Sequence, residues 1–212
     1  MKKLVFCSLI ISSIMICNAQ TPDCPCNETK GKDHERLFLK DRHIPNSGYK
    51  THTVRIGKII NDWDLPKTFT KDDTTTFPTE KKIYKVKGYL RLAKIEDNDC
   101  DVHLEIGESE SGDHDRVIAE IPNTQEYCAL RDAFIGELKT KFGLDKTIDH
   151  DGIAFGEDTD DVPAITVTGY GFLDASHKSA KNPKKGNRHG STDVMTLWEI
   201  HPVFEVKLEK AE

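Results

Sequence analysis

The chain of 212 residues carries a formal net charge of −6 at pH 7, and 31% of its residues are charged. A net acidic surface repels nucleic acid, so the composition argues against a general nucleic-acid-binding protein and allows only a local contact. The length is that of one ordinary domain with extensions.

Residues 1–19 have the pattern of a secretory signal peptide. Lysines precede an apolar run at Leu4–Cys17, and cleavage is expected between Ala19 and Gln20. The run is shorter than the roughly 20 residues that a membrane-spanning helix needs, and no later segment reaches that length. We therefore expect a secreted or periplasmic protein without a membrane span.

The next segment, residues 20–82, is predicted to be an N-terminal arm and linker in which His52–Ile60 has the composition of a short strand. Residues 83–209 are predicted to form the main domain. Hydrophobic periodicity there indicates three strands, one helix and two further strands. In chain order these are Tyr84–Ile95, Val102–Ile106, Val117–Ile121, a helix that ends at Gly143, Ala164–Leu173 and Thr196–Leu208.

This order is that of an OB fold, a mainly β, five-stranded barrel that binds ligands on one side. Glycines 88, 169 and 171 suit the sharply bent strands of such a barrel. Asn123 and Glu126 have the spacing of a helix capping box. An open antiparallel sheet with one helix is the competing interpretation.

Residues 96–106, EDNDCDVHLEI, alternate between an apolar set and a polar set. If Val102 faces Ile121 across a hairpin, then His103 faces Glu120 on the outer side of the barrel. The last strand adds two outward side chains. The predicted ligand face therefore consists of Asp101, His103, Glu105, Glu120, Glu199 and His201.

Carboxylates and imidazoles are ligands for a divalent cation, zinc or a similar metal. The candidate metal ligands are Asp101, His103, Glu120, Glu199 and His201. The alternative is a hydrated acidic face on which His103 pairs with Glu120. Binders of single-stranded nucleic acid use aromatic platforms and a basic groove, which this face lacks.

The cysteines outside the signal are Cys24, Cys26, Cys100 and Cys128, which allow three disulfide pairings. Strand parity places Cys100 at the start of the second barrel strand, close to the helix that carries Cys128. This proximity favours a Cys100–Cys128 disulfide in an oxidising compartment. The partners of Cys24 and Cys26 stay open.

Two further groups of residues are weaker candidates. Asp174 and His177 are spaced as an acid–base pair, but no nucleophile motif accompanies them. The loop 178–188 is basic and could hold a phosphate, or could simply neutralise the acidic loop 107–115. Its candidate ligand-binding residues are Lys181, Lys184, Lys185 and Arg188.

Four segments, VKGYLRLAKIEDNDCDVHLEI, RVIAEIPNTQEYC, VTGYGFLDASH and WEIHPVFEV, resemble a family of largely uncharacterised bacterial secreted proteins. The shared motifs are ExDxDxH, GxGFxDxxH and E(I/L)HPV. Lys178-Ser179 stand where many relatives have Gly-Gln. The resemblance implies an OB-like barrel and no settled activity, and it covers Tyr84 to Val206. It places these residues at motif positions: Asp99, Asp101, His103, Glu120, Asp174, His177, Glu199 and His201.

The sequence thus predicts a secreted OB-fold binding module with an acidic, histidine-bearing ligand face that can be metal-loaded. One alternative is a metal-dependent hydrolase of the phosphodiesterase or nuclease type, in which the cation activates water. Another is a structural, envelope-associated protein. The pattern leans away from an enzyme and leaves the ligand and the oligomeric state open.

Overall fold

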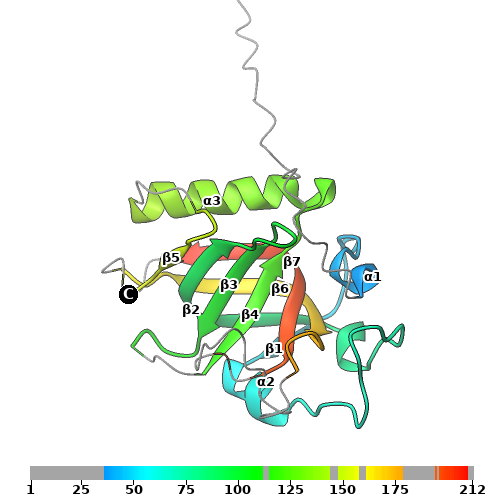
Figure 1. The fold of residues 1–212 in the computed structure, drawn as a ribbon. Coiled ribbons are helices and arrows are strands. Elements are labelled where there is room, and N and C mark those ends of the chain that lie inside the picture. The colour runs from blue at the N-terminus through cyan, green and yellow to red at the C-terminus, as the bar shows by residue number, and fades with distance from the viewer. Residues whose placement is uncertain are drawn as a thin grey trace, which may run out of the picture.

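Five strands of the computed structural model close on themselves into a barrel, so the chain is mainly β as predicted (Figure 1). The structure describes residues 36–111, 115–143, 148–157, 161–178, 194 and 196–209. The barrel strands are β2 (Ile83–Ile95), β3 (Val102–Gly107), β4 (Arg116–Ile121), β6 (Ala164–Leu173) and β7 (Trp198–Glu209).

The strand order around the barrel is β2-β3-β4-β7-β6, and β2 pairs with β6 to close the ring. β4 and β7 run parallel, whereas the other neighbouring barrel strands are antiparallel. This is the arrangement of an OB-like barrel. The alternative of an open sheet is wrong, because Tyr89 of β2 pairs with Gly107 on one side and with Ala164 on the other.

Two glycines lie where barrel strands come too close together for a side chain. A Cβ atom on Gly88 would lie 2.4 Å from the carbonyl oxygen of Gly107. A Cβ atom on Gly169 would lie 2.4 Å from the carbonyl oxygen of Pro202. The pairing register of β6 and β7 shifts at Gly169, as expected where a strand bends to close a barrel.

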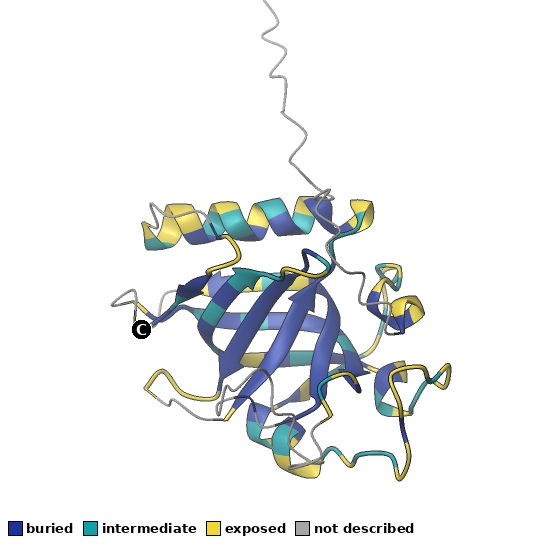
Figure 2. Cartoon of the chain, viewed as in Figure 1, coloured by how far each residue is buried: buried dark blue, intermediate teal, exposed yellow. Residues whose placement is uncertain are grey.

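Alternation along the strands fills the barrel interior with apolar side chains. Val102, Leu104 and Ile106 of β3 have no exposed surface, and Val117 and Ala119 of β4 are equally buried. In Figure 2 the barrel strands are drawn mostly in the colour of buried residues. The apolar parity in the sequence therefore identified the inner face of β3 and β4 correctly.

The predicted helix is α3 (Cys128–Phe142), which lies across one end of the barrel with its buried side toward the strands (Figures 1 and 2). Phe134 and Leu138 are the buried contacts at its centre. The helix ends at Gly143, whose φ of 63° is the left-handed conformation that glycine adopts without strain.

The predicted capping box at the start of this helix is wrong. A short 3₁₀ turn, η2 (Gln125–Tyr127), precedes α3, and the residues at the two N-cap positions, Thr124 and Tyr127, make no side-chain cap bond. Glu126 instead accepts a hydrogen bond of 2.8 Å from the backbone N–H of Ile44. The sequence spacing therefore did not predict that Glu126 contacts the backbone of Ile44.

The chain before the barrel packs on the barrel rather than extending away from it. It contains α1 (Leu37–Lys40), β1 (Thr51–Val54), α2 (Ile56–Asp62) and η1 (Thr79–Lys81). The predicted strand at His52–Ile60 is half wrong, because only its first part pairs with β2. Ile56 and Ile59 recur at helical spacing and are fully buried, so the second part is helical.

A buried ion pair ties residue 36 to the barrel. Arg36 Nη1 and Nη2 donate to the two carboxylate oxygens of Glu80 at 2.6 and 2.7 Å, and Glu80 has no exposed surface. Glu80 also accepts from the backbone N–H of Leu173 at 3.0 Å. This two-point geometry fixes the start of the described chain against the end of β6.

Between α3 and β6 lies a short strand, β5 (Ile153–Ala154), which pairs with β2. Among the helices within the described ranges, none has the length and apolar character needed to cross a bilayer.

A pair of glycine substitutions tests the close approach of the strands. Gly169→Ala should lower the free energy of unfolding by about 1–3 kcal/mol, because the new methyl group would meet backbone. Gly136→Ala in α3 is the matched control, since nothing lies within 4 Å of the added atom. It should raise stability by up to about 1 kcal/mol through helix propensity. Urea denaturation measures both, and equal effects would contradict the packing argument.

Candidate metal centre

The polar residues predicted for the ligand face come together on the outer side of β3, β4 and β7. His103 and Glu120 are register partners in the β3–β4 pair, as predicted. Ala119 of β4 pairs with Ile200 of β7, which places the neighbours Glu120 and His201 on adjoining strands. The strand pairing thus brings both histidines to the same carboxylate.

Glu120 lies between the two imidazole rings. Its Oε1 is 2.8 Å from Nδ1 of His103, and its Oε2 is 2.8 Å from Nδ1 of His201. Each carboxylate oxygen therefore faces a different histidine.

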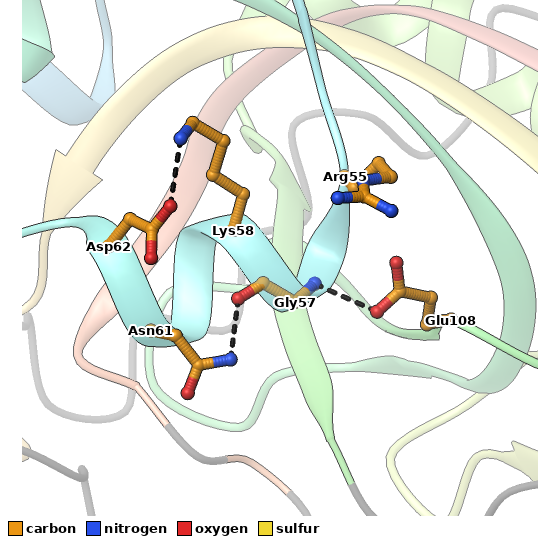
Figure 3. A pocket seen from close by; sticks show the side chains of 6 residues that line it. All are labelled: Arg55, Gly57, Lys58, Asn61, Asp62 and Glu108. Carbon is orange, nitrogen blue, oxygen red and sulfur yellow. Dashed lines mark hydrogen bonds and ion pairs between the residues drawn. The ribbon is translucent and has the colours of Figure 1, made fainter.

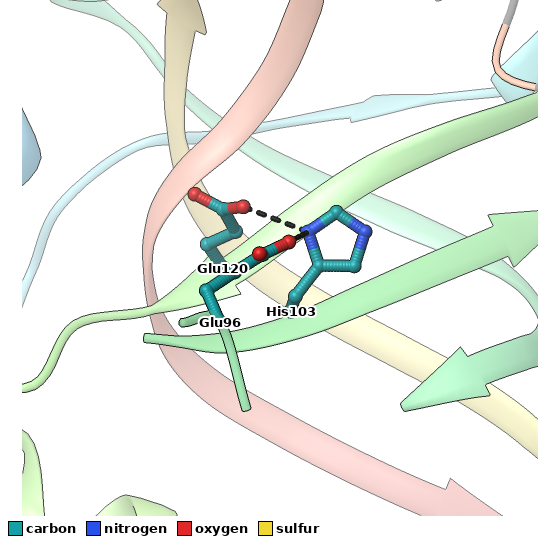
Figure 4. A group of neighbouring side chains, drawn as sticks. All are labelled: Glu96, His103 and Glu120. Carbon is teal, nitrogen blue, oxygen red and sulfur yellow. Dashed lines mark hydrogen bonds and ion pairs between the residues drawn. The ribbon is translucent and has the colours of Figure 1, made fainter. Parts of the chain in front are cut away.

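His103 contacts two further carboxylates. Its Nδ1 is 3.0 Å from Oε1 of Glu96, and its Nε2 is 3.9 Å from Oε1 of Glu105. Glu105 is in turn bound by Arg116 at 2.9 Å. Figure 4 shows Glu96 and Glu120 converging on the same ring nitrogen of His103.

His201 is the most enclosed member of the cluster. Its Nε2 is 3.3 Å from Oδ2 of Asp101, and its Nδ1 is 3.9 Å from Oε2 of Glu199. The ring is fully buried, yet neither ring nitrogen has a hydrogen-bond partner. The other oxygen of Asp101 accepts from the backbone N–H of Asn123 at 2.7 Å, which fixes this carboxylate in place.

The alternative of a hydrated acidic face is wrong, because the structure buries these side chains. Asp101, His103, Glu105, Glu120, Glu199 and His201 are all 7% exposed or less. Residues 36–44, which we call the covering segment, lie against this face. Lys40 Nζ is 3.6 Å from Oδ2 of Asp99, and Arg42 donates to the backbone oxygen of His201 at 3.3 Å.

The buried charges shift one another's pKa values. Burial lowers the pKa of His103, but its bonds to Glu105, Glu120 and Glu96 outweigh burial and raise it to about 10. Burial likewise opposes the charge on His201, but the adjacent Asp101 and Glu120 raise its pKa to about 9. Without a metal, both rings therefore carry a proton at neutral pH.

The surroundings shift the pKa values of the carboxylates in opposite directions. Burial opposes the charge on Glu120, but its contacts to both histidines hold its pKa well below the usual range. The pKa of Glu96 is similarly lowered, to about 2, by His103 acting against burial. Burial and the neighbouring Asp101 raise the pKa of Asp99 to about 6.

The sequence pattern missed Glu96 as a member of the cluster. Strand parity assigned it to the other face, but a turn separates it from β3. The backbone N–H of Cys100 bonds to the carbonyl oxygen of Glu96, and Cys100 has a φ of 61°. Asp97, the next residue, contacts His150 at 2.9 Å instead.

The weak catalytic candidates Asp174 and His177 are in contact, as their spacing suggests. His177 Nδ1 bonds to Asp174 Oδ2 and lies 3.2 Å from the hydroxyl of Ser176. A nucleophile relay would need opposite ring nitrogens for the acid and the hydroxyl. Asp174 Oδ1 also accepts from the backbone N–H of Ser176, so the arrangement is that of a local turn. The basic candidates Lys181, Lys184, Lys185 and Arg188 lie outside the described residues.

A separate polar hollow of about 310 Å³ lies beside α2 (Figure 3). Glu108 accepts there from the backbone N–H of Gly57 at 3.0 Å, and Lys58 pairs with Asp62 at 2.8 Å. Because these polar groups already bind one another, the hollow is a weaker candidate site than the buried cluster.

Comparison of the chain with family models, with curated proteins and with solved structures gave no match. The resemblance to a bacterial secreted family stays a prediction. The argument for a site therefore rests on the geometry of the buried cluster.

The protonation of the two histidines is testable in the metal-free protein. Both rings should be protonated at pH 7.5, because their folded-state pKa values lie above the value of about 6.5 for an unperturbed histidine. NMR of the ring carbons against pH, assigned with His103→Gln and His201→Gln variants, measures this. A pKa near 6.5 for both rings would contradict the description of the cluster.

The same shifts set the pH dependence of stability. Since the folded-state pKa values are raised, the contribution of these rings to stability is full below about pH 6.5 and is lost as the pH rises through about 9 to 10. The metal-free protein should accordingly melt at a lower temperature at pH 10 than at pH 6.5.

Proposed function

We propose that the barrel is a metal-binding module that holds a divalent transition metal ion at Asp101, Glu120 and His201. These three residues offer ligand atoms that all lie within 4.8 Å of one another. The observation that carries the proposal is the buried His201 ring, whose nitrogens lie close to carboxylates but have no hydrogen bond. An ion bound among these residues would satisfy one of the two ring nitrogens, since an imidazole gives one ligand atom to an ion.

A buried polar atom left without a hydrogen-bond partner costs about 1–3 kcal/mol of stability per group. A protonated imidazole would relieve this cost only if its N–H groups pointed at the carboxylate oxygens. Nδ1 of His201 is 2.8 Å from Glu120 but is not aligned for such a bond. A metal ion is less demanding, because it takes the nitrogen and the oxygens as ligands together.

The ligand chemistry indicates which ion would bind. One imidazole with two carboxylates is a donor set found in zinc sites, and imidazole also suits other late first-row metals. Calcium and magnesium prefer sites made of oxygen ligands alone. Zinc or a similar transition metal is therefore the ion that fits the residues present.

The burial of the cluster favours a binding or structural role over hydrolysis. A catalytic metal needs an open position that a substrate can reach. Asp101, Glu120 and His201 are 5%, 6% and 0% exposed. The basic loop that would hold a phosphate lies outside the described residues, so nothing in the geometry supports the phosphodiesterase alternative.

The compartment belongs to the same proposal. The N-terminal sequence pattern supports export to the periplasm or the cell exterior. An oxidising compartment would also allow the predicted disulfide between Cys100 and Cys128. Both cysteines are buried, which supports a pairing between them.

The pairing of the cysteines in disulfides needs a direct test, since Cys24 and Cys26 lie outside the described residues. Non-reducing peptide mapping of the exported protein by mass spectrometry should recover a peptide that joins Cys100 to Cys128. The same digest after reduction is the control. Peptides that link either residue to Cys24 or Cys26 would replace this pairing with one of the two others.

Metal binding itself is tested by elemental analysis of the purified protein after dialysis against zinc. At least one equivalent should remain bound, and excess zinc should raise the melting temperature, since an ion present at 100 times its Kd adds about 2.7 kcal/mol. His201→Ala should lower the bound metal by at least one equivalent.

The matched control is His43→Ala, which removes a histidine whose side chain is 94% exposed but which also pairs with a glutamate. It should retain the metal of the unmodified protein. Absence of bound metal, together with an unchanged melting temperature in zinc, would refute the proposal.

A further inference from the structure

We propose that the centre binds two metal ions and that the Glu120 carboxylate bridges them. The second ion would be held by Glu96, His103 and Glu120, the other set of ligand atoms that lie within 4.8 Å of one another. This inference rests on the proposed function and adds a second ion to it.

The geometry of Glu120 is the first argument. Its two oxygens face different histidines at the same distance, 2.8 Å, so one carboxylate oxygen is available to each ion. Carboxylates that bridge in this way occur in two-metal sites, where the ions are about 3.5–4 Å apart. A single-ion site would need only one of these oxygens.

The second argument is that each histidine has its own additional carboxylate. Glu96 is 3.0 Å from Nδ1 of His103, and Asp101 is 3.3 Å from Nε2 of His201. Each proposed ion would thus have one imidazole nitrogen, one carboxylate of its own and the shared Glu120. At His103 both carboxylates lie at the same ring nitrogen, whereas at His201 they lie at different ring nitrogens. These ligands lie on the three strands β3, β4 and β7 and in the turn before β3.

The two ions would differ in access to solvent. The side chain of Glu96 is 27% exposed, whereas that of His201 is fully buried. A chelator should therefore remove the ion at Glu96 and His103 first. The ion at His201 should leave more slowly, because its ligands must open before water reaches it.

The stoichiometry of the full-length protein is the first measurement. Elemental analysis after zinc loading should give two equivalents, and Glu96→Gln or His103→Ala should give one. His201→Ala should also give one, and Glu120→Gln should weaken both sites by at least tenfold. Glu126→Gln is the matched control, because Glu126 contacts a histidine on the surface, and it should keep both ions.

A second measurement needs no variant, so it holds even if a buried substitution prevents folding. Cobalt(II) is loaded in place of zinc, and the EPR signal per ion is compared at one and at two equivalents. A bridging carboxylate couples the two ions magnetically, so the signal per ion should fall when the second equivalent binds.

The outcomes separate this inference from the proposed function. One equivalent that is lost in His201→Ala but kept in Glu96→Gln and His103→Ala would overturn the second ion and leave the proposed function standing. Two equivalents without magnetic coupling would overturn the bridge. No bound metal would overturn both proposals.

Discussion

The burial of the Glu120 carboxylate between two imidazole rings is the constraint on which the polar half of this structure depends. An isolated carboxylate in such a position would be strongly disfavoured, so positive charge must be present on both of its sides. β3 and β7 supply that charge as His103 and His201. Glu120 lies on the central strand of the three, which places its carboxylate within reach of both histidines.

The inner and outer faces of the barrel strands are packed in different ways. The inner faces of the strands exclude water with apolar side chains, and the outer faces of β3, β4 and β7 exclude it with mutually compensating charges. The covering segment and its anchor, the ion pair between Arg36 and Glu80, close the outer layer. Such a charged layer favours a single arrangement of its side chains. If one charged group moved away from its partner, the partner would stay buried as an unpaired charge.

The sequence predicted the barrel because period-two alternation marks which strand faces are apolar, and the order of strands and helix limits the topology. The same two-residue periodicity predicted that His103 lies opposite Glu120. It could not predict burial of the outer face, since alternation separates two faces without indicating what covers either one. The covering segment is short and mixes apolar with charged residues, so no periodicity marked it. Glu96 was missed because the turn ending at Cys100 breaks the parity on which the prediction depended.

The covering segment and the strand that it contacts lie far apart in the sequence. Arg42 donates a hydrogen bond to the backbone oxygen of His201, which lies 159 positions later in the chain. During synthesis the outer face of β7 can therefore be covered only after β7 itself has been made. Until then, the polar side chains on β3 and β4 lack the charges of β7 that compensate them.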